Sequence, residues 1–248
     1  MTLRESMEKQ GNWLFKWRSY FPLLGIPVLL MALSNANSIE KTYGDLAGGL
    51  WGILCISISF LGFSIRCLTA GYVSAGTSGR NTQSQVAEML NTTGMYSLVQ
   101  HPLYLGNFII MLGLALFTQV WWFVLIICLA FWIYYERIIF AEEEFLTGKF
   151  GDSFLDWTAK TPIFFPNFRK LEKPALQFSV KTVLRREFST FFAIIVSFTI
   201  LHTVIDIITE GKLKISLLWI IFFGGGLIIY LILYFLKKKT RILHVKGR

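Results

Sequence analysis

Long apolar runs separated by short polar or charged segments dominate the chain from residue 21 onward. A helix needs about 20 mostly apolar residues to cross a hydrocarbon core of roughly 30 Å. The runs that approach this length are about residues 21–35, 46–68, 103–117, 120–135, 188–208 and 215–236. The third and fourth are separated only by "TQ", which predicts a tight helical hairpin. We therefore expect an all-α fold, a polytopic transmembrane helix bundle of about six spans.

Composition supports a membrane protein, because 54% of the residues are hydrophobic and only 16% are charged, against roughly 25% charged in soluble domains. The first run is the weakest candidate because it is short and contains two prolines. Arg66, near the end of the second run, is expected to snorkel or to lie at the interface. The first 20 residues, with "NWLFKW", resemble an interfacial anchor more than a cleavable signal peptide.

Lysine and arginine gather before the first run, between the fourth and fifth runs, and in the tail "KKKTRILHVKGR". The loops after the first, third and fifth runs hold only Lys41, Lys212 and Lys214. Basic loops stay on the cytoplasmic side, so both termini are expected in the cytoplasm, most simply across a bacterial inner membrane. The net charge of +9 then follows from topology and from attraction to anionic lipid, and it does not indicate nucleic-acid binding.

The three cysteines, Cys55, Cys67 and Cys128, lie in or beside apolar runs and show no CxxC spacing. Their number is odd, so a disulfide framework is not expected. Neither does their spacing suggest a metal site.

A polar cluster stands where the third run begins, in "TTGMYSLVQHPLYLGN", residues 92–107. The "HP" pair predicts an extended histidine, His101, followed by a proline that starts a helix. Tyr96 and Tyr104 could belong to an interfacial aromatic belt. A binding or reactive site is the alternative.

Four acids, Glu136 and the run Glu142 to Glu144, lie where the chain is expected to leave the bilayer after the fourth run. They could form a solvated helix end. Otherwise carboxylates at that depth need partners, and the sequence offers Arg137, Lys149 or a bound cation.

Taken together, these two segments resemble the isoprenylcysteine carboxyl methyltransferase and phospholipid methyltransferase family of integral membrane methyltransferases. The family pattern reads G-x-Y-x-x-x-R-H-P-x-Y-x-G, then E-E-x-x-L-x-x-x-F-G-x-x-Y, and the resemblance covers roughly residues 50–166. The matching residues are Gly94, Tyr96, His101, Pro102, Tyr104, Gly106, Glu142, Glu143, Leu146, Phe150 and Gly151. Gln100 replaces the family arginine, and Phe154 replaces the last tyrosine.

The resemblance implies methyl transfer from S-adenosyl-L-methionine, in a cytoplasmic pocket closed by residues 137–166. The catalytic residues would be His101, Glu142 and Glu143. The cofactor-binding residues would be Tyr96, Gln100, His101, Pro102, Leu103, Tyr104, Gly106, Glu142 and Glu143. The methyl displacement itself requires no metal.

The acceptor implied is a membrane lipid or a lipidated substrate, such as a prenylated cysteine carboxylate. An amine acceptor, as in a phospholipid N-methyltransferase, would need a base, for which Glu142, Glu143 and His101 are candidates. Two other hypotheses remain open, namely an NADPH-dependent membrane reductase of isoprenoids or sterols and a non-catalytic lipid-binding protein. The chain is expected to divide into an N-terminal segment with the first span, 1–45, a methyltransferase-like core, 46–170, and a linker with two further spans and a basic tail, 171–248.

Overall fold

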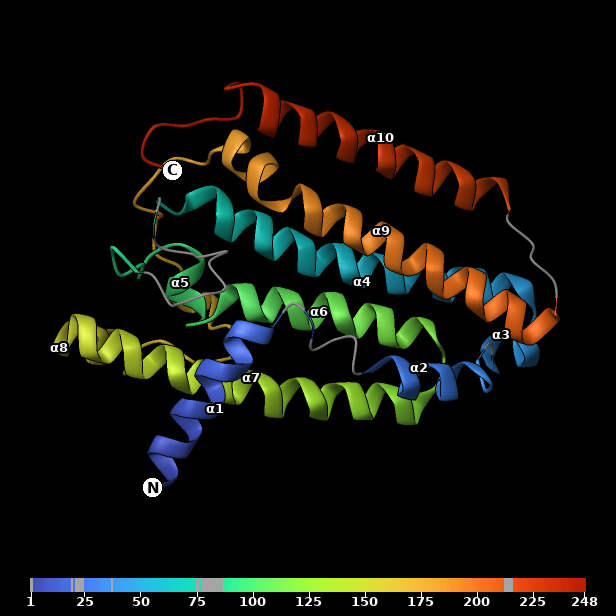
Figure 1. Ribbon diagram of the computed structural model, residues 1–248, viewed down its shortest axis with the longest axis horizontal. Helices are drawn as coiled ribbons and strands as arrows, with labels where there is room; N and C mark the ends of the chain where they lie inside the picture. The colour runs from blue at the N-terminus through green and yellow to red at the C-terminus, as the bar shows by residue number, and fades with distance from the viewer. Residues whose placement is uncertain are drawn as a thin grey trace.

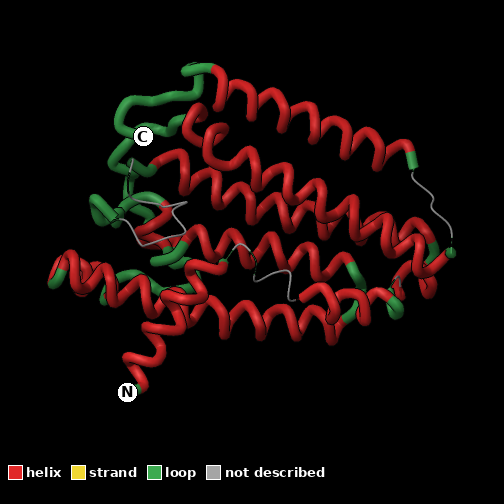
Figure 2. Tube along the Cα trace, viewed as in Figure 1, coloured by secondary structure: helices red, strands yellow, loops and turns green. Residues whose placement is uncertain are grey.

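A computed structural model describes residues 2–18, 20, 25–36, 38–74, 76, 87–211 and 216–248. Helices and loops account for all of these residues, and no strand occurs among them (Figure 2). The elements are α1 (Leu3–Trp17), α2 (Ile26–Leu33), α3 (Ser38–Tyr43), α4 (Asp45–Tyr72), α5 (Met95–Leu98), α6 (Pro102–Phe117), α7 (Trp121–Phe150), α8 (Asp152–Thr158), the 3-10 turn η2 (Phe168–Lys170), α9 (Val180–Glu210) and α10 (Leu217–Lys239). The predicted all-α membrane bundle is confirmed.

Within the described residues, four helices, α4, α7, α9 and α10, are long and apolar enough to cross a membrane. The third predicted span forms α6, which has only 16 residues. The first predicted span differs more: residues 21–24 lie outside the described residues, and the remainder forms α2, with 8 residues. A helix of that length rises only about 12 Å, so α2 cannot cross a bilayer by itself.

Five helices lie side by side in the order α10, α9, α4, α6 and α7 (Figure 1). The helix α1 crosses α7, and α3 packs on the start of α4. Because α9 packs directly on α4, the C-terminal helices are part of the same bundle as the central ones. The predicted division of the chain into three parts stays a prediction.

The hairpin between α6 and α7 agrees with the sequence prediction. Its turn places Gln119 at φ 59°, a positive value that is uncommon for a residue with a side chain. The Gln119 side chain accepts a hydrogen bond from the backbone N–H of Ile39 at 2.7 Å. This contact ties the turn to the start of α3, so the hairpin is fixed from outside as well as by its own backbone.

Small residues allow α4 and α6 to approach closely. A Cβ atom at Gly113 would lie 2.3 Å from Ser59 Oγ and 2.6 Å from the Cys55 carbonyl oxygen, and one at Gly62 would lie 2.6 Å from the Gly106 carbonyl oxygen. Ser59 Oγ donates to the carbonyl of Ile110 at 2.8 Å. Interfaces of this kind are common between membrane helices, where packing replaces the hydrophobic effect.

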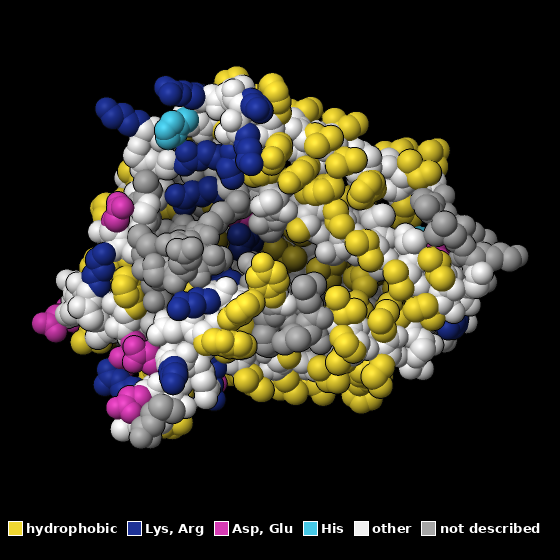
Figure 3. Space-filling view, viewed as in Figure 1, with side chains coloured by type: hydrophobic (Ala, Val, Ile, Leu, Met, Phe, Trp, Pro, Cys, Tyr) yellow, Lys and Arg dark blue, Asp and Glu magenta, His cyan; other side chains and the backbone are white. Residues whose placement is uncertain are grey.

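Charged side chains on the visible face gather toward the end of the bundle that holds α8 and both ends of the chain (Figures 1 and 3). Hydrophobic side chains cover most of the remaining face (Figure 3). The His-Pro segment and the acids of α7 both lie at the charged end.

Candidate active site

The polar segment before α6 has the local structure that the sequence predicts. His101 is extended, with φ −122° and ψ 64°, and Pro102 occupies the first turn of α6. The His101 carbonyl accepts the backbone N–H groups of Tyr104 and Leu105, each at 3.1 Å. Proline has no backbone N–H group, so it can occupy the first turn of a helix without leaving a donor unpaired. His101 is thereby held at the N-terminus of α6.

Helix α7 continues to Phe150 instead of ending near residue 135, so the glutamates stand on a rigid helix. Tyr104 Oη donates to Glu142 Oε2 at 2.8 Å. His101 Nδ1 lies 3.8 Å from Glu142 Oε2, and His101 Nε2 lies 3.6 Å from Glu143 Oε1. Four of the residues named from the sequence therefore meet at one place, although 38 positions separate Tyr104 from Glu142.

The His101 ring is buried and stacks on Tyr104, with ring centroids 5.5 Å apart and planes 14° from parallel. Its Nε2 atom is buried and has no hydrogen-bond partner among the described residues. A buried polar atom without a partner costs free energy, and such atoms are frequent where a ligand supplies the partner.

The other acids are used differently. Glu144 Oε2 pairs with Arg4 of α1 at 2.5 Å, and this hydrogen bond raises the pKa of Arg4. Glu136 is half exposed, with Arg137 Nη1 3.9 Å from its carboxylate. The sequence offered Arg137, Lys149 or a bound cation as partners for the four acids. In the structure, Glu142 and Glu143 face His101 and Tyr104.

Gln100 does not join this cluster. Its Nε2 donates to the carbonyl of Thr158, the last residue of α8, at 3.2 Å and to that of Thr161, just after α8, at 2.6 Å. The buried Oε1 of Gln100 has no partner among the described residues. Tyr96 lies on α5, where its carbonyl accepts Trp157 Nε1 at 3.2 Å, and burial raises the pKa of its hydroxyl. Through these hydrogen bonds, Tyr96 and Gln100 connect α5 and the residues after it to α8.

The remaining predicted residues border the site rather than face the acids. Pro102 is fully buried in the first turn of α6. Gly106 faces α4, where a Cβ atom would lie 2.6 Å from Arg66 Cγ. Leu103 lines a neighbouring cavity.

The segment after α8 runs beneath α5 and is hydrogen-bonded to it. The backbone N–H of Gln100 donates to Pro162 at 2.9 Å, that of Asn167 to Leu98 at 3.0 Å, and that of Glu172 to Ser97 Oγ at 2.9 Å. Gly151 joins α7 to α8 at φ 52°, a conformation that suits glycine. The glycine of the second motif thus turns the chain back under the first motif.

The sequence interpretation missed a cationic cavity of about 260 Å³ beside Tyr104. Its lining contains Arg18, Leu103, Tyr104, Asn107, Tyr135, Ile138, Arg66, Ala70, Arg186 and Glu187. It therefore carries three arginines and one carboxylate, a formal charge of +2 from the described lining.

One charged network organises the wall of this cavity. Arg66 donates to both carboxylate oxygens of Glu187 on α9, at 2.8 and 3.0 Å, and to Asn107 Oδ1 at 2.6 Å. Asn107 Nδ2 donates to Tyr135 Oη at 3.0 Å. Four helices are connected in this way, and Arg66 is paired inside the bundle instead of snorkelling as expected. Ionisable residues within apolar segments indicate function by default, and that signal could have identified Arg66.

No group of three or more His, Cys, Asp or Glu side chains suited to a metal ion occurs among the described residues.

Comparison with known proteins assigns the central part of the chain. Residues 50–153 match the family described as phospholipid methyltransferase. This segment contains most of α4, all of α5 to α7 and both motifs up to Gly151. The resemblance to membrane methyltransferases seen in the sequence is therefore confirmed for this part of the chain.

Three curated relatives match similar stretches. Protein-S-isoprenylcysteine O-methyltransferase of Schizosaccharomyces pombe is 35% identical over 157 residues, covering 58% of this chain and 66% of that protein. Cobalt-zinc-cadmium resistance protein CzcN of Cupriavidus metallidurans is 33% identical over 119 residues, 48% of this chain and 52% of the relative. Nickel-cobalt-cadmium resistance protein NccN of Alcaligenes xylosoxydans xylosoxydans is 33% identical over 142 residues, which cover 57% of this chain and 61% of the relative.

The chain thus spans between about half and two thirds of the length of these relatives. No solved structure matches it.

Proposed function

We propose that the protein transfers a methyl group from S-adenosyl-L-methionine to the carboxylate of a lipid-borne acceptor, such as a prenylated cysteine. One observation carries this proposal: an acidic site and a cationic cavity meet at Tyr104. The tyrosine hydroxyl contacts Glu142 on one side, and the same residue lines the arginine cavity on the other. A cationic methyl donor and an anionic acceptor require such a pair of neighbouring environments.

The acidic side suits the cofactor. The donor carries a sulfonium and an amino group, for which Glu142 and Glu143 are suitable anions, and the stacked rings of His101 and Tyr104 present aromatic surface. The buried, unpartnered Nε2 of His101 offers one more polar contact. When bound, S-adenosyl-L-methionine supplies an electrophilic methyl group. The protein's part is to orient both reactants and to exclude water.

The cationic side suits a carboxylate. A carboxylate is already a nucleophile, so no base has to remove a proton from it. Arg186 and Arg66 would attract and orient it, and Glu187 holds the Arg66 guanidinium in a fixed, bidentate geometry. A protonated amine would be repelled by the positive lining, which is why we favour O-methylation over N-methylation.

The charged end of the bundle is proposed to face the cytoplasm, with both termini, as the positive-inside rule predicts. The apolar tail of the acceptor would stay in the bilayer while its head enters between α4, α6 and α9. The bacterial inner membrane is the proposed location.

Calorimetric titration of the purified, detergent-solubilised protein with S-adenosyl-L-methionine tests the cofactor. We expect saturable binding that Glu143→Ala weakens. The matched control is Glu144→Ala, since this neighbouring carboxylate pairs with exposed Arg4 outside the site. No binding to either protein would overturn the proposal, and titration with NADPH would then test the reductase hypothesis. Absence of both would leave a lipid-binding role.

The acceptor is tested with methyl-labelled cofactor and two substrates, farnesylated N-acetylcysteine and vesicles containing phosphatidylethanolamine. A methyl ester releases volatile label in alkali, whereas an N-methyl group does not. We expect label from the cysteine substrate that alkali releases, and a raised KM for that substrate in Arg186→Gln. Alkali-stable label on phosphatidylethanolamine would instead establish N-methylation.

A further inference from the structure

After α10 the chain turns back toward the rest of the bundle. Residues 240–248, which we call the return segment, run from the end of α10 to the end of α4 and the start of α9 (Figure 1). The backbone N–H of His244 donates to the Arg241 carbonyl at 2.9 Å, which forms a turn, and Leu243 within this turn is buried. The return segment is therefore packed against the bundle.

One contact of the return segment is with α4. Arg248 Nη1 donates to the Gly71 carbonyl at 3.1 Å, across 177 positions of the chain. The same carbonyl accepts the backbone N–H of Ser179, the residue before α9, at 3.0 Å. Carbonyls in the last turn of a helix have no partner within the helix, and a cation there is favoured by the helix dipole. Arg248 thus caps α4 at the place where α9 begins.

A second contact of the return segment is with α9, through Arg185. Arg185 Nη1 lies 3.1 Å from His244 Nδ1, and Arg185 Nη2 donates to the backbone oxygen of Arg248. A guanidinium can only donate hydrogen bonds, so His244 Nδ1 is the acceptor. The return segment therefore joins the last turn of α4 to the first turns of α9.

Both contact points lie next to the cationic cavity. Gly71 follows Ala70, Arg185 precedes Arg186, and both Ala70 and Arg186 line that cavity. Inside the cavity the same two helices are joined by the bidentate ion pair described above. The spacing of α4 and α9 at the cavity is thus held from inside by this ion pair and from outside by the return segment.

We propose that Arg248 is a positioning residue for the methyl acceptor. It is not among the described residues that line the cavity, so it would act through α4 and α9, by setting the spacing of the arginines that these helices contribute. Guanidinium groups bind a carboxylate strongly only when their donors are held in a matching geometry. The inference rests on the proposed function, because it requires the acceptor carboxylate to bind in the cationic cavity.

This assignment gives the C-terminal part of the chain a role in the reaction. Helices α9 and α10 and the return segment all follow residues 50–153, the segment that matches the methyltransferase family. The acids proposed to hold the cofactor stand on α7, and no contact of the return segment with α7 occurs among the described hydrogen bonds and ion pairs. Acceptor binding should therefore depend on Arg248, whereas cofactor binding should not.

The first test is saturable binding of tritiated, farnesylated N-acetylcysteine to the protein in phosphatidylcholine nanodiscs without cofactor, after subtraction of uptake by empty nanodiscs. Arg248→Ala should weaken this binding about three- to tenfold, the value of one hydrogen bond. Arg248→Lys should restore most of the affinity, since an ammonium group can also donate to the Gly71 carbonyl. Lys246→Ala is the matched control, because it removes an exposed cation from the same segment, and it should bind as the parent protein does.

The second test separates positioning from a general loss of structure. Arg248→Ala should raise the KM for the farnesylated substrate by the same factor, while kcat and the calorimetric affinity for S-adenosyl-L-methionine stay at the parent values. Parent-like acceptor binding in Arg248→Ala, equal weakening in Lys246→Ala, or no recovery in Arg248→Lys would each overturn the inference. So would uptake by the parent protein no greater than that of empty nanodiscs. A parent protein that binds the farnesylated carboxylate but not S-adenosyl-L-methionine would overturn the proposed function alone.

Discussion

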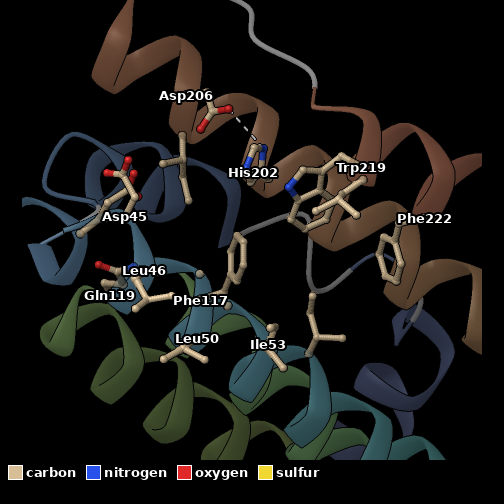
Figure 4. Close-up of a pocket in the computed structure, with 17 residues that line it drawn as sticks. Asp45, Leu46, Leu50, Ile53, Phe117, Gln119, His202, Asp206, Trp219 and Phe222 are labelled. Carbon is tan, nitrogen blue, oxygen red and sulfur yellow. Dashed lines mark ion pairs between the residues drawn. The ribbon is translucent and has the colours of Figure 1, made fainter. Parts of the chain in front are cut away.

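The two ends of the bundle form cavities by opposite means. At the charged end, side chains from α4, α6, α7 and α9 are tied together by short hydrogen bonds around Arg66, and the cavity is small. At the other end, α4, α9 and α10 border a cavity of about 690 Å³, and one of its lining residues, Gly49 of α4, would meet nothing within 4 Å if it carried a Cβ atom (Figure 4). The first arrangement fixes the positions of charged side chains, whereas the second leaves space open beside a helix.

The largest difference should appear when the charged network is broken. Glu187 and Arg66 side chains are only 5% and 14% exposed, so Glu187→Ala leaves a guanidinium largely buried without its carboxylate. Removing one partner of a buried pair costs about 3–5 kcal/mol, and we expect a loss of that order in the free energy of unfolding, measured in detergent. The double variant Arg66→Met and Glu187→Met should recover most stability but not methyl transfer. Undiminished stability in Glu187→Ala would contradict a structural role for the pair.

The second effect tests the acidic site. Glu143→Ala should weaken S-adenosyl-L-methionine binding roughly ten- to a hundredfold, the value of a hydrogen bond to a charged group. Glu144→Ala is the control, because its carboxylate pairs with exposed Arg4, and it should bind the cofactor as the parent protein does. Equal weakening in both variants, measured by calorimetry, would contradict a specific role for Glu143.

The glycines give the third comparison, within a single helix pair. Gly113→Ala places a methyl group against Ser59 and the Cys55 carbonyl and should destabilise the protein by about 1–3 kcal/mol through overpacking. Gly49→Ala meets nothing within 4 Å and should stabilise α4 by about 0.5–1 kcal/mol. Thermal unfolding of the two variants in one detergent checks this difference in sign. If both changed stability in the same direction, the contrast between packed and open glycines would fail.

The smallest effect is expected at Gln100. Its amide donates to two carbonyls at the end of α8, and a guanidinium could donate to the same groups and would favour a helix C-terminus. Gln100→Arg should therefore keep methyl transfer within about threefold of the parent, a change of roughly 0.6 kcal/mol. Gln100→Leu, which cannot donate, is the control and should lose activity. Complete inactivation by Gln100→Arg would show that the pocket has been rebuilt around glutamine.

Much of the fold follows from local sequence features. Apolar runs give the long helices, the His-Pro pair gives the start of α6, and "TQ" gives the α6–α7 turn, because each depends on neighbouring residues alone. The family resemblance named His101, Tyr104, Glu142 and Glu143 together. Without the resemblance, the sequence left a solvated helix end as an alternative for the glutamates, and the roles of these four residues stay predictions.

Tertiary structure decided what lies between helices. The Arg66–Glu187 pair joins residues 121 positions apart, and its formation depends on how α4 and α9 are rotated toward each other. The same holds for the cavity beside Gly49, because the sequence does not distinguish a glycine whose space a neighbouring helix fills, as at Gly113, from one whose space stays open, as at Gly49. The sequence by itself determined which segments are helical and apolar. The packing of those helices determined which side chains meet and which spaces stay open, because both depend on distances between residues far apart in the chain.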